Sequence, residues 1–506
     1  DMNLMAGMGR YLDSGDGSDI SYENANDHIQ GSSVGMADGP FYPTSYKYKN
    51  EKRSQFVRGS FDLFGRYVVS ASLRRDGTDK FFPSKKYALF PSVSLAWKMN
   101  EESFIKNISW INMLKLRASY GETGSDNLGT TLYGIVTTAR EDVQFNNNSV
   151  TYIPYILSGA NYEDVTWQKT VMKNIGLDFS IFRDRIWGSV DVFRNDVTHL
   201  LGTAPTELLG MHGTRPINGG HYKRTGIDVS LNSLNLQTHD FKWTSQITMS
   251  HYNAVWIERM PNYDYQKYQK RKNEPMNAFY YYKTTGIIDM DKSNMPESQR
   301  SLGPAACMPG YPIVEDKNGD GIIDVNDSYM DNMLPKLYFG FGNTFTWKNF
   351  DLDIFMYGQL GVKKWNDAYS YSADAGNLSR GVDAHNVGIY SYNIWNTQTN
   401  TNGYFPGIAI SKSVALPENL GFDYTRENAS YIRVRNITLG YNLGPKELSV
   451  FKGYIRGIRV FVDFQNPLTF TKYKGYDPEI NTSSSNLTGG QYPQMRVYSI
   501  GAKLTF

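Results

Sequence analysis

The chain has 506 residues, a formal net charge of +2 and a mean hydropathy of -0.48. Such a small net charge gives no general electrostatic reason to expect nucleic acid or an acidic substrate as a partner. Cys307 is the single cysteine, which excludes a disulfide framework within the chain and any site built from several cysteines. No run of about 20 apolar residues is present, so a spanning helix is not expected. Low hydropathy still permits a membrane β-barrel, because only alternate residues of its strands face the lipid.

Alternation of apolar and polar residues predicts fourteen strands. In chain order these cover residues 2–12, 55–64, 66–76, 92–100, 114–121, 171–182, 185–195, 223–234, 241–253, 336–347, 350–360, 431–443, 457–466 and 494–506. In such strands we expect carboxylates and arginines to face a wet interior and aliphatic side chains to face lipid. In a soluble β-sandwich the same apolar face would be the core.

The connections between these segments alternate sharply in length. The short ones lie at Gly65, at residues 183–184, near Gln237 and at residues 348–349, and the long ones include residues 123–167, 254–335 and 361–430. Short turns on one side and long loops on the other are typical of a membrane barrel. A soluble domain rarely contains structureless loops longer than about 15 residues.

The last segment favours the same interpretation. Tyr498, Ile500, Ala502 and Leu504 alternate with small or polar residues, and the chain ends on Phe506. A strand that ends on an aromatic residue resembles the C-terminal insertion signal of outer-membrane barrels. The chain opens without a charged-then-apolar signal segment, so we expect a processed chain or a piece of a longer one.

Several phrases, in this order, resemble the SusC/RagA family of TonB-dependent outer-membrane transporters. They are residues 66–77 (RYVVSASLRRDG), 90–97 (FPSVSLAW), 114–124 (LKLRASYGETG), Trp167, 174–179 (NIGLDF), 316–321 (DKNGDG), 432–441 (IRVRNITLGY) and 465–479 (QNPLTFTKYKGYDPE). The resemblance spans nearly the whole chain. It implies an all-β fold, a transmembrane antiparallel barrel of 22 strands with a plugged lumen. Residues 1–506 would be the C-terminal part of that barrel, about 14 strands, without plug or first strands.

The resemblance also implies the function and the partners. It implies outer-membrane import of nutrient oligomers with a SusD-like surface lipoprotein, energised by the TonB-ExbB-ExbD complex acting on the N-terminal part. Oligosaccharide is the expected cargo and oligopeptide the alternative. Two other classes stay open at this point, a passive porin of fourteen strands and a soluble all-β binding protein.

Residues 316–327 follow the spacing of an EF-hand loop. The expected ligands are Asp316, Asn318, Asp320, Ile322 through its carbonyl, Asp324 and Asp327. Asp327 stands where a bidentate Glu is usual, and no flanking helix pattern is evident. The sequence therefore leaves two interpretations, a Ca²⁺ site with a structural role and an Asx-rich turn satisfied by its own backbone.

No enzyme signature is evident in the sequence, so catalytic residues and organic cofactors are not expected. The segment 31–35 fits a nucleophile-elbow pattern but lies in an Asn-, Asp- and Gly-rich stretch with no strand before it. The aromatic and amide-rich loops suit sugar, because rings stack on pyranose faces and amides bond hydroxyl groups. The expected substrate contacts are Trp395, Tyr392 and Asn393, and the expected lumen residues are Asp351, Asp353 and Tyr357.

Overall fold

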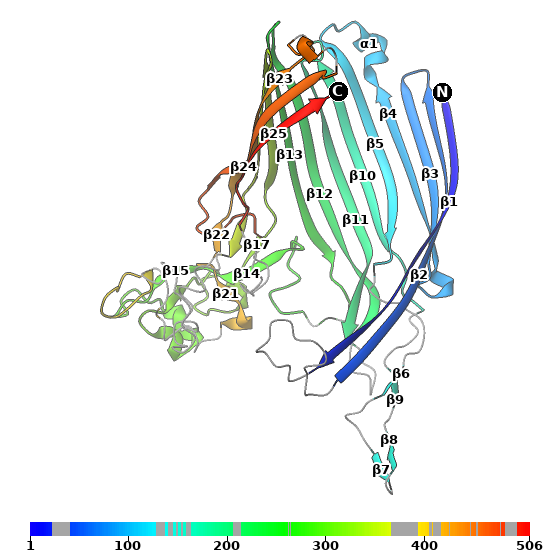
Figure 1. Cartoon of the computed structure of the whole chain (residues 1–506). Coiled ribbons are helices and arrows are strands. Elements are labelled where there is room, and N and C mark those ends of the chain that lie inside the picture. The colour runs from blue at the N-terminus through cyan, green and yellow to red at the C-terminus, as the bar shows by residue number, and fades with distance from the viewer. Residues whose placement is uncertain are drawn as a thin grey trace.

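The computed structural model describes residues 1–22, 41–127, 137–139, 145–147, 150–152, 155–157, 163–205, 214–261, 263, 265–365, 393–403, 407, 416–424, 426–445, 447–451, 454–475, 477–480 and 493–506. One antiparallel sheet of fourteen strands dominates it (Figure 1). The strands are β1 (Met2–Tyr22), β2 (Phe41–Leu63), β3 (Tyr67–Thr78), β4 (Tyr87–Lys98), β5 (Ile111–Ser125), β10 (Gln168–Ile181), β11 (Ile186–Pro205), β12 (Thr214–Gln237), β13 (Phe241–Glu258), β18 (Leu337–Trp347), β19 (Phe350–Leu360), β23 (Tyr431–Leu443), β24 (Gly457–Thr471) and β25 (Val497–Thr505). Each strand pairs with the next in this order, so all fourteen predicted strands and the all-β fold are confirmed.

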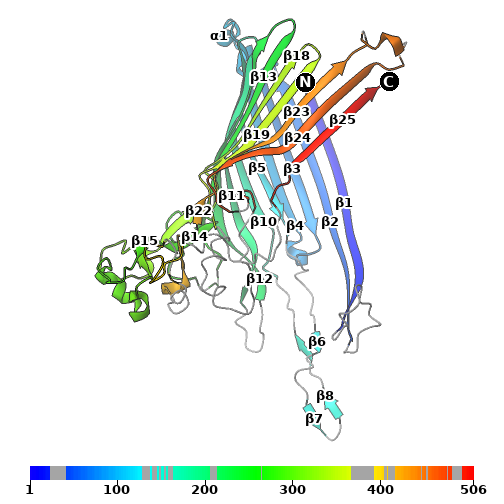
Figure 2. The same cartoon turned by 60° about the vertical axis from the view of Figure 1, so that its left-hand side comes forward.

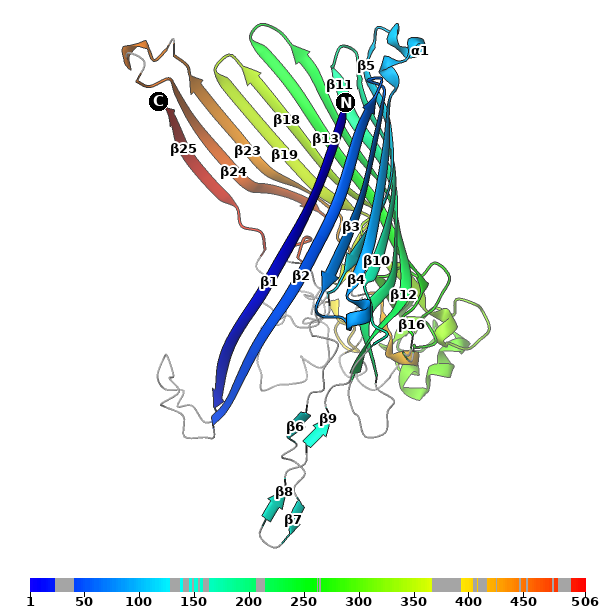
Figure 3. The ribbon, with the colours of Figure 1, turned by 90° about the vertical axis from the view of Figure 1, so that its right-hand side faces the viewer.

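The sheet curves but does not close within the part of the chain that the structure describes. Its edges are β1 and β25, which pair only with β2 and β24 respectively. Figures 2 and 3 show the resulting open trough, and Figure 3 shows the gap between the two edge strands. An edge strand has unpaired backbone groups, which cannot be left so in a membrane.

Several strands are longer than predicted, and the extra length is at the end that bears the long loops. β1 runs to Tyr22, where the prediction stopped at residue 12, and it pairs in unbroken register with β2 from Met2–Phe61 to Tyr22–Phe41. β12 likewise begins at Thr214, where the prediction began at residue 223. In a membrane barrel the strands can extend past the band of apolar residues that faces lipid. There neither face needs apolar residues, so the alternation of apolar and polar residues disappears while the backbone pairing continues.

The hairpins at the opposite end are tight. Phe64 and Gly65, with φ of 57° and 68°, join β2 to β3. Two consecutive positive φ values are the type I′ arrangement, whose twist matches that of the paired strands. The connection from β4 to β5 is longer and contains the one short α-helix of the described residues, α1 (Ser103–Lys106). Among all the residues that the structure describes, no helix is long and apolar enough to cross a membrane.

The register aligns apolar side chains into rows across the sheet. One row joins Leu95 to Ala118, Ile175, Val192 and Ile227 on five successive strands. Ile175 is 62% exposed and Val192 55%, although both are aliphatic. Continuous rows of exposed aliphatic side chains need an apolar medium, because water would make them costly. This face is therefore the one that lipid would cover.

Part of the long-loop end is itself folded. Short strands β14 (Ala278–Tyr282), β17 (Tyr329–Asn332) and β21 (Gly421–Phe422) form one sheet, and β15 (Thr284–Ile287) pairs with β16 (Pro312–Val314). Buried side chains pack between them in two clusters, one of Tyr282, Val314, Ile323 and Leu416, the other of Ile288, Ala306, Tyr311 and Ile313. Burial raises the pKa of Tyr311 to about 12. Residues 278–332, together with residues 416 and 421–422, are therefore a packed cap at the loop end (Figure 1).

Candidate functional site

The face opposite the aliphatic rows is polar, and its side chains bond across neighbouring strands. Ser60 and Ser70 lie 2.8 Å apart through their hydroxyl oxygens. The Arg117 guanidinium on β5 donates to both carboxylate oxygens of Asp178 on β10 at 2.8 and 2.7 Å, and to Asp191 on β11 at 3.1 Å. Bidentate pairing fixes the geometry as well as adding energy. The face is a connected polar wall, as a water-filled or plugged lumen needs.

The three predicted lumen residues, Asp351, Asp353 and Tyr357, lie on this polar face of β19. Asp351 pairs with Arg459 on β24 at 2.5 Å, and Asp353 accepts from the Thr344 hydroxyl at 2.6 Å. Their register partners on β18 are, in the same order, Thr346, Thr344 and Gly340. Substrate contact by these residues stays a prediction, and each already has an internal partner.

Tyr357 belongs to a buried polar cluster that the sequence did not single out. Its hydroxyl donates to Glu479 at 2.7 Å, and Arg433 on β23 donates to Glu479 and to Asp477, each at 2.7 Å. Arg433 is 2% exposed and Asp477 is 5% exposed. Burial by itself would raise the pKa of Asp477, but hydrogen bonds from the amides of Glu479 and Gln494 and from Arg433 hold it below its usual value. This cluster ties residues 477–480 to the polar wall.

A hollow of about 500 Å³ lies on the wall across β11, β12, β13, β18, β19 and β23. The polar groups that line it include Asp228, Thr248, Tyr338, Tyr357, Gln359 and Arg435. The Tyr338 ring stacks on Tyr252 with centroids 5.7 Å apart, and the Arg224 guanidinium lies 3.9 Å from the Tyr252 centroid. Tyrosine rings beside hydroxyl, amide and charged groups can bind either a sugar or a peptide.

Two of the three predicted loop contacts, Trp395 and Asn393, lie among the described residues. Trp395 is only 6% exposed, and its ring lies so close to Gly310 that a Cβ there would meet it at 2.3 Å. That burial counts against Trp395 as a stacking surface. Asn393 is exposed, and Tyr392 lies outside the described residues. Contact of any of these three with a substrate stays a prediction.

The Asp-rich loop folds as a chain of turns that its own carboxylates cap. Asp316 accepts from the Gly319 and Gly321 amides at 2.8 and 2.9 Å. Asp327 is fully buried and accepts from the amides of Lys317 at 2.9 Å, Asn318 at 3.3 Å and Asp324 at 2.8 Å. The Asn318 and Asp320 side chains accept from the amides two residues on, and the Asp324 side chain from that of Asn326.

These contacts fit the backbone-satisfied turn more closely than the metal site. Across the part of the chain that the structure describes, no group of three or more His, Cys, Asp or Glu side chains is placed to hold a metal ion. We therefore assign no step to a cation, and Ca²⁺ at residues Asp316, Asn318, Asp320, Ile322, Asp324 and Asp327 stays a prediction.

Comparison with known proteins agrees with this two-faced sheet. Residues 3–466 match the model of a family described as TonB dependent receptor-like, beta-barrel. The chain belongs to this TonB-dependent receptor-like β-barrel family. The resemblance noted in the sequence is thereby confirmed.

Individual relatives support the same family. The chain is 28% identical to TonB-dependent receptor P3 of Formosa agariphila over 97% of this chain and 48% of the relative. It is 27% identical to TonB-dependent receptor SusC of Bacteroides thetaiotaomicron over 92% of this chain and 44% of that one. The chain thus spans about half the length of these curated relatives.

Solved structures show the fold. The whole chain superposes on 53% of a chain in the structure of the RagAB peptide transporter, with a TM-score of 0.78 and 22% identity. A second RagAB structure, a peptide importer in an open-open state, gives a TM-score of 0.76 at the same identity. In both comparisons the chain corresponds to about half of a longer chain of the same fold.

Proposed function

We propose that this chain forms part of the wall of a TonB-dependent importer in the bacterial outer membrane, where it serves uptake and not catalysis. The observation that carries the proposal is the two-faced sheet, with aliphatic rows on one side and a bonded polar wall on the other. Family membership supports it, because both curated relatives are TonB-dependent receptors by name. A plug domain outside residues 1–506 would take the pull of the TonB-ExbB-ExbD complex.

A SusD-like lipoprotein is the partner we propose at the loop end. The packed cap built on β14, β15, β16, β17 and β21 gives that end a defined surface, which a lid needs for reproducible docking. The fold is similar to that of a chain in the structure of the RagAB peptide transporter. Co-purification of the full-length protein with a lipoprotein encoded beside it would support this partner, and recovery without one would argue against it.

Oligosaccharide is the cargo we propose. The hollow that contains Tyr338, Tyr357, Gln359 and Arg435 offers aromatic rings beside hydroxyl, amide and guanidinium groups. Oligopeptide is the second candidate, favoured by the likeness in fold to a peptide transporter. Isothermal titration of the full-length protein and its partner against glycan and peptide libraries decides between them.

The transport proposal itself is tested in cells. Deletion of the gene should abolish growth on the cargo, and the intact gene should restore it only when TonB is active. Growth that persists without TonB, or ion conductance by residues 1–506 alone in a planar bilayer, would favour the passive porin. Extraction of the protein without detergent would favour a soluble binding protein and would end the membrane proposal.

A further inference from the structure

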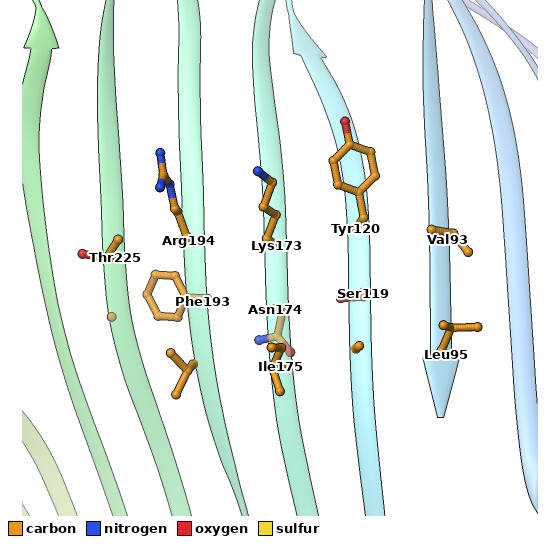
Figure 4. Close-up of a pocket in the computed structure, with 13 residues that line it drawn as sticks. Val93, Leu95, Ser119, Tyr120, Lys173, Asn174, Ile175, Phe193, Arg194 and Thr225 are labelled. Atoms are coloured by element: carbon orange, nitrogen blue, oxygen red, sulfur yellow. The ribbon is translucent and has the colours of Figure 1, made fainter. Parts of the chain in front are cut away.

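A second hollow, of about 510 Å³, lies on the aliphatic face of the sheet across β4, β5, β10, β11 and β12. Its apolar wall includes Val93, Leu95, Ile175 and Val192. In Figure 4 the polar tips of Tyr120, Lys173 and Arg194 point toward the end of the sheet at which β5 finishes, which is the loop end. The hollow is therefore amphipathic along the strands, aliphatic toward the middle of the sheet and cationic toward the loops.

The strand register explains this order. The aliphatic row of Leu95, Ala118, Ile175 and Val192 is followed, two residues nearer the loops, by the row Val93, Tyr120, Lys173, Arg194 and Thr225. Both rows occupy the same face because side chains repeat every two residues. The apolar band thus gives way to a phenol and two cations within one step along the strands.

Lys173 and Arg194 are direct partners in the register of β10 and β11. Like charges directly opposite one another destabilise a sheet. Arg194 has some compensation from Asp196 at 2.8 Å. Lys173 has no carboxylate within ion-pair distance among the described residues, and its side chain is exposed. The unfavourable pair is understandable if an anion lies between the two side chains.

The next row toward the loops does not supply that anion. Its two carboxylates are already engaged, Glu122 by Lys169 at 2.6 Å and Asp196 by Arg194. Lys223, which is the register partner of Asp196, adds another cation. This part of the face therefore has more cations than carboxylates, and the excess lies around Lys173.

We infer that this hollow binds a membrane lipid with an anionic, phosphorylated headgroup. The acyl chains lie along Leu95, Ile175 and Val192, and the phosphate accepts hydrogen bonds from Lys173 and Arg194. A guanidinium and an ammonium side by side are suited to phosphate oxygens. The inference rests on the proposed function, because it needs the aliphatic rows to face a bilayer.

A lipid fits this surface better than a second protein does. The aliphatic part of the hollow is continuous with the aliphatic row that runs across five successive strands, so the same medium covers both. The change from aliphatic to cationic residues runs along the strands, which is the direction of the membrane normal within the strand tilt. A protein partner would need a surface that changes from apolar to anionic in the same direction. A lipid has this arrangement in its acyl chains and its anionic headgroup.

The test uses the full-length protein in nanodiscs of phosphatidylcholine with or without added phosphatidic acid. After transfer to detergent, native mass spectrometry counts the retained lipids. We expect retention of phosphatidic acid over phosphatidylcholine, and about tenfold weaker retention in the Lys173→Gln/Arg194→Gln variant, because two charge-assisted hydrogen bonds are lost. The matched control is Lys106→Gln/Arg183→Gln, which removes two exposed cations at the opposite end and should retain lipid as the parent does.

Apart from the absence of any lipid preference in the parent, three results would overturn the inference. They are equal retention by the parent and the Lys173/Arg194 variant, displacement of the lipid by inorganic phosphate alone, and a change in oligomeric state of the variant with lipid retention unchanged. The last would assign the surface to a second protein copy. Heat-modified migration in gels shows whether each variant is folded. A protein that requires detergent but has no lipid preference contradicts only this inference, whereas a detergent-free protein contradicts the proposed function.

Discussion

At the scale of single residues, the most consequential side chain of the polar wall is Arg433. It is nearly fully buried, yet it has three partners, Thr469, Asp477 and Glu479, at 2.9, 2.7 and 2.7 Å. Removing one partner of a buried ion pair costs more than the pair contributes, because the other charge remains buried without compensation. The cluster therefore makes the position of residues 477–480 depend on one arginine.

Arg433→Ala should destabilise the protein by about 3–5 kcal/mol, because it leaves Asp477 buried without its cation. Arg433→Lys keeps the positive charge but loses the planar guanidinium that reaches several acceptors at once. Its stability should lie between that of the parent and that of Arg433→Ala. Chemical denaturation of the refolded protein gives these values. The control is Arg300→Ala, whose partner Glu297 is 82% exposed and whose loss should change stability by less than about 1 kcal/mol. Equal effects at the two arginines would contradict the buried role of Arg433.

The same cluster predicts a pH dependence. Because the folded-state pKa of Asp477 is lowered, its contribution to stability is present above the unfolded pKa of about 3.9 and is lost as the pH falls through the folded value. The denaturant concentration at the unfolding midpoint, measured between pH 7 and pH 2, should therefore decrease in the parent once the pH is lower than about 4. The Asp477→Asn variant should be less stable at pH 7 and should lack that part of the decline. Parallel profiles for the two proteins would show that Asp477 does not titrate in this way.

Asp327 predicts a loop effect that does not depend on a metal. Its carboxylate accepts three backbone amides in a buried position, and each amide left without an acceptor costs about 1–3 kcal/mol. Asp327→Ala should therefore expose residues 316–328 to proteolysis. Melting with Ca²⁺ or Mg²⁺ tests the cation separately. A rise in melting temperature with Ca²⁺ alone would establish the ion, and an unchanged value would leave a self-satisfied turn.

At the scale of the element, the two faces of each strand should differ in their tolerance of charge. Val190 on β11 lies in an aliphatic row with Leu177 and Val229, and its neighbour Ser189 lines the hollow on the polar wall. Val190→Arg should cost about 2–4 kcal/mol near the middle of the bilayer, whereas Ser189→Arg should cost far less. Unfolding in lipid vesicles measures both. If the substitution at Ser189 were the more costly, the assignment of the faces would be reversed.

The strands also show where reading alternation succeeds and where it fails. The bounds of β19 and β23 agree with the prediction at both ends, because each is flanked by a tight turn or a change of pattern. β1 and β2 were predicted ten or more residues too short at the loop end. In those parts of β1 and β2 the backbone hydrogen bonds hold the strands together, and the side chains no longer alternate in a way that predicts a strand.

At the scale of the whole molecule, the open sheet is the feature with the widest consequence. A passive porin of fourteen strands would have to pair β1 with β25, whereas a larger barrel places other strands between them. In the full-length protein with Cys307→Ser, we expect no disulfide between Leu4→Cys and any of Ile500→Cys, Ala502→Cys or Leu504→Cys. The pair Ile458→Cys and Leu504→Cys is the positive control, since these residues are register partners. Cross-linking from Leu4 to β25 would support the porin.

The sequence by itself determined the strands, their order and the two chemically different faces, because these depend on a two-residue period that is written locally in the chain. The family phrases even contained Arg433, Asp477 and Glu479, without showing that they meet. Only the tertiary structure decided which side chains share a site, because residues 46 positions apart along the chain, such as Arg433 and Glu479, are joined by register and loop return. For the same reason Trp395 became buried, and Lys173 came to lie beside Arg194.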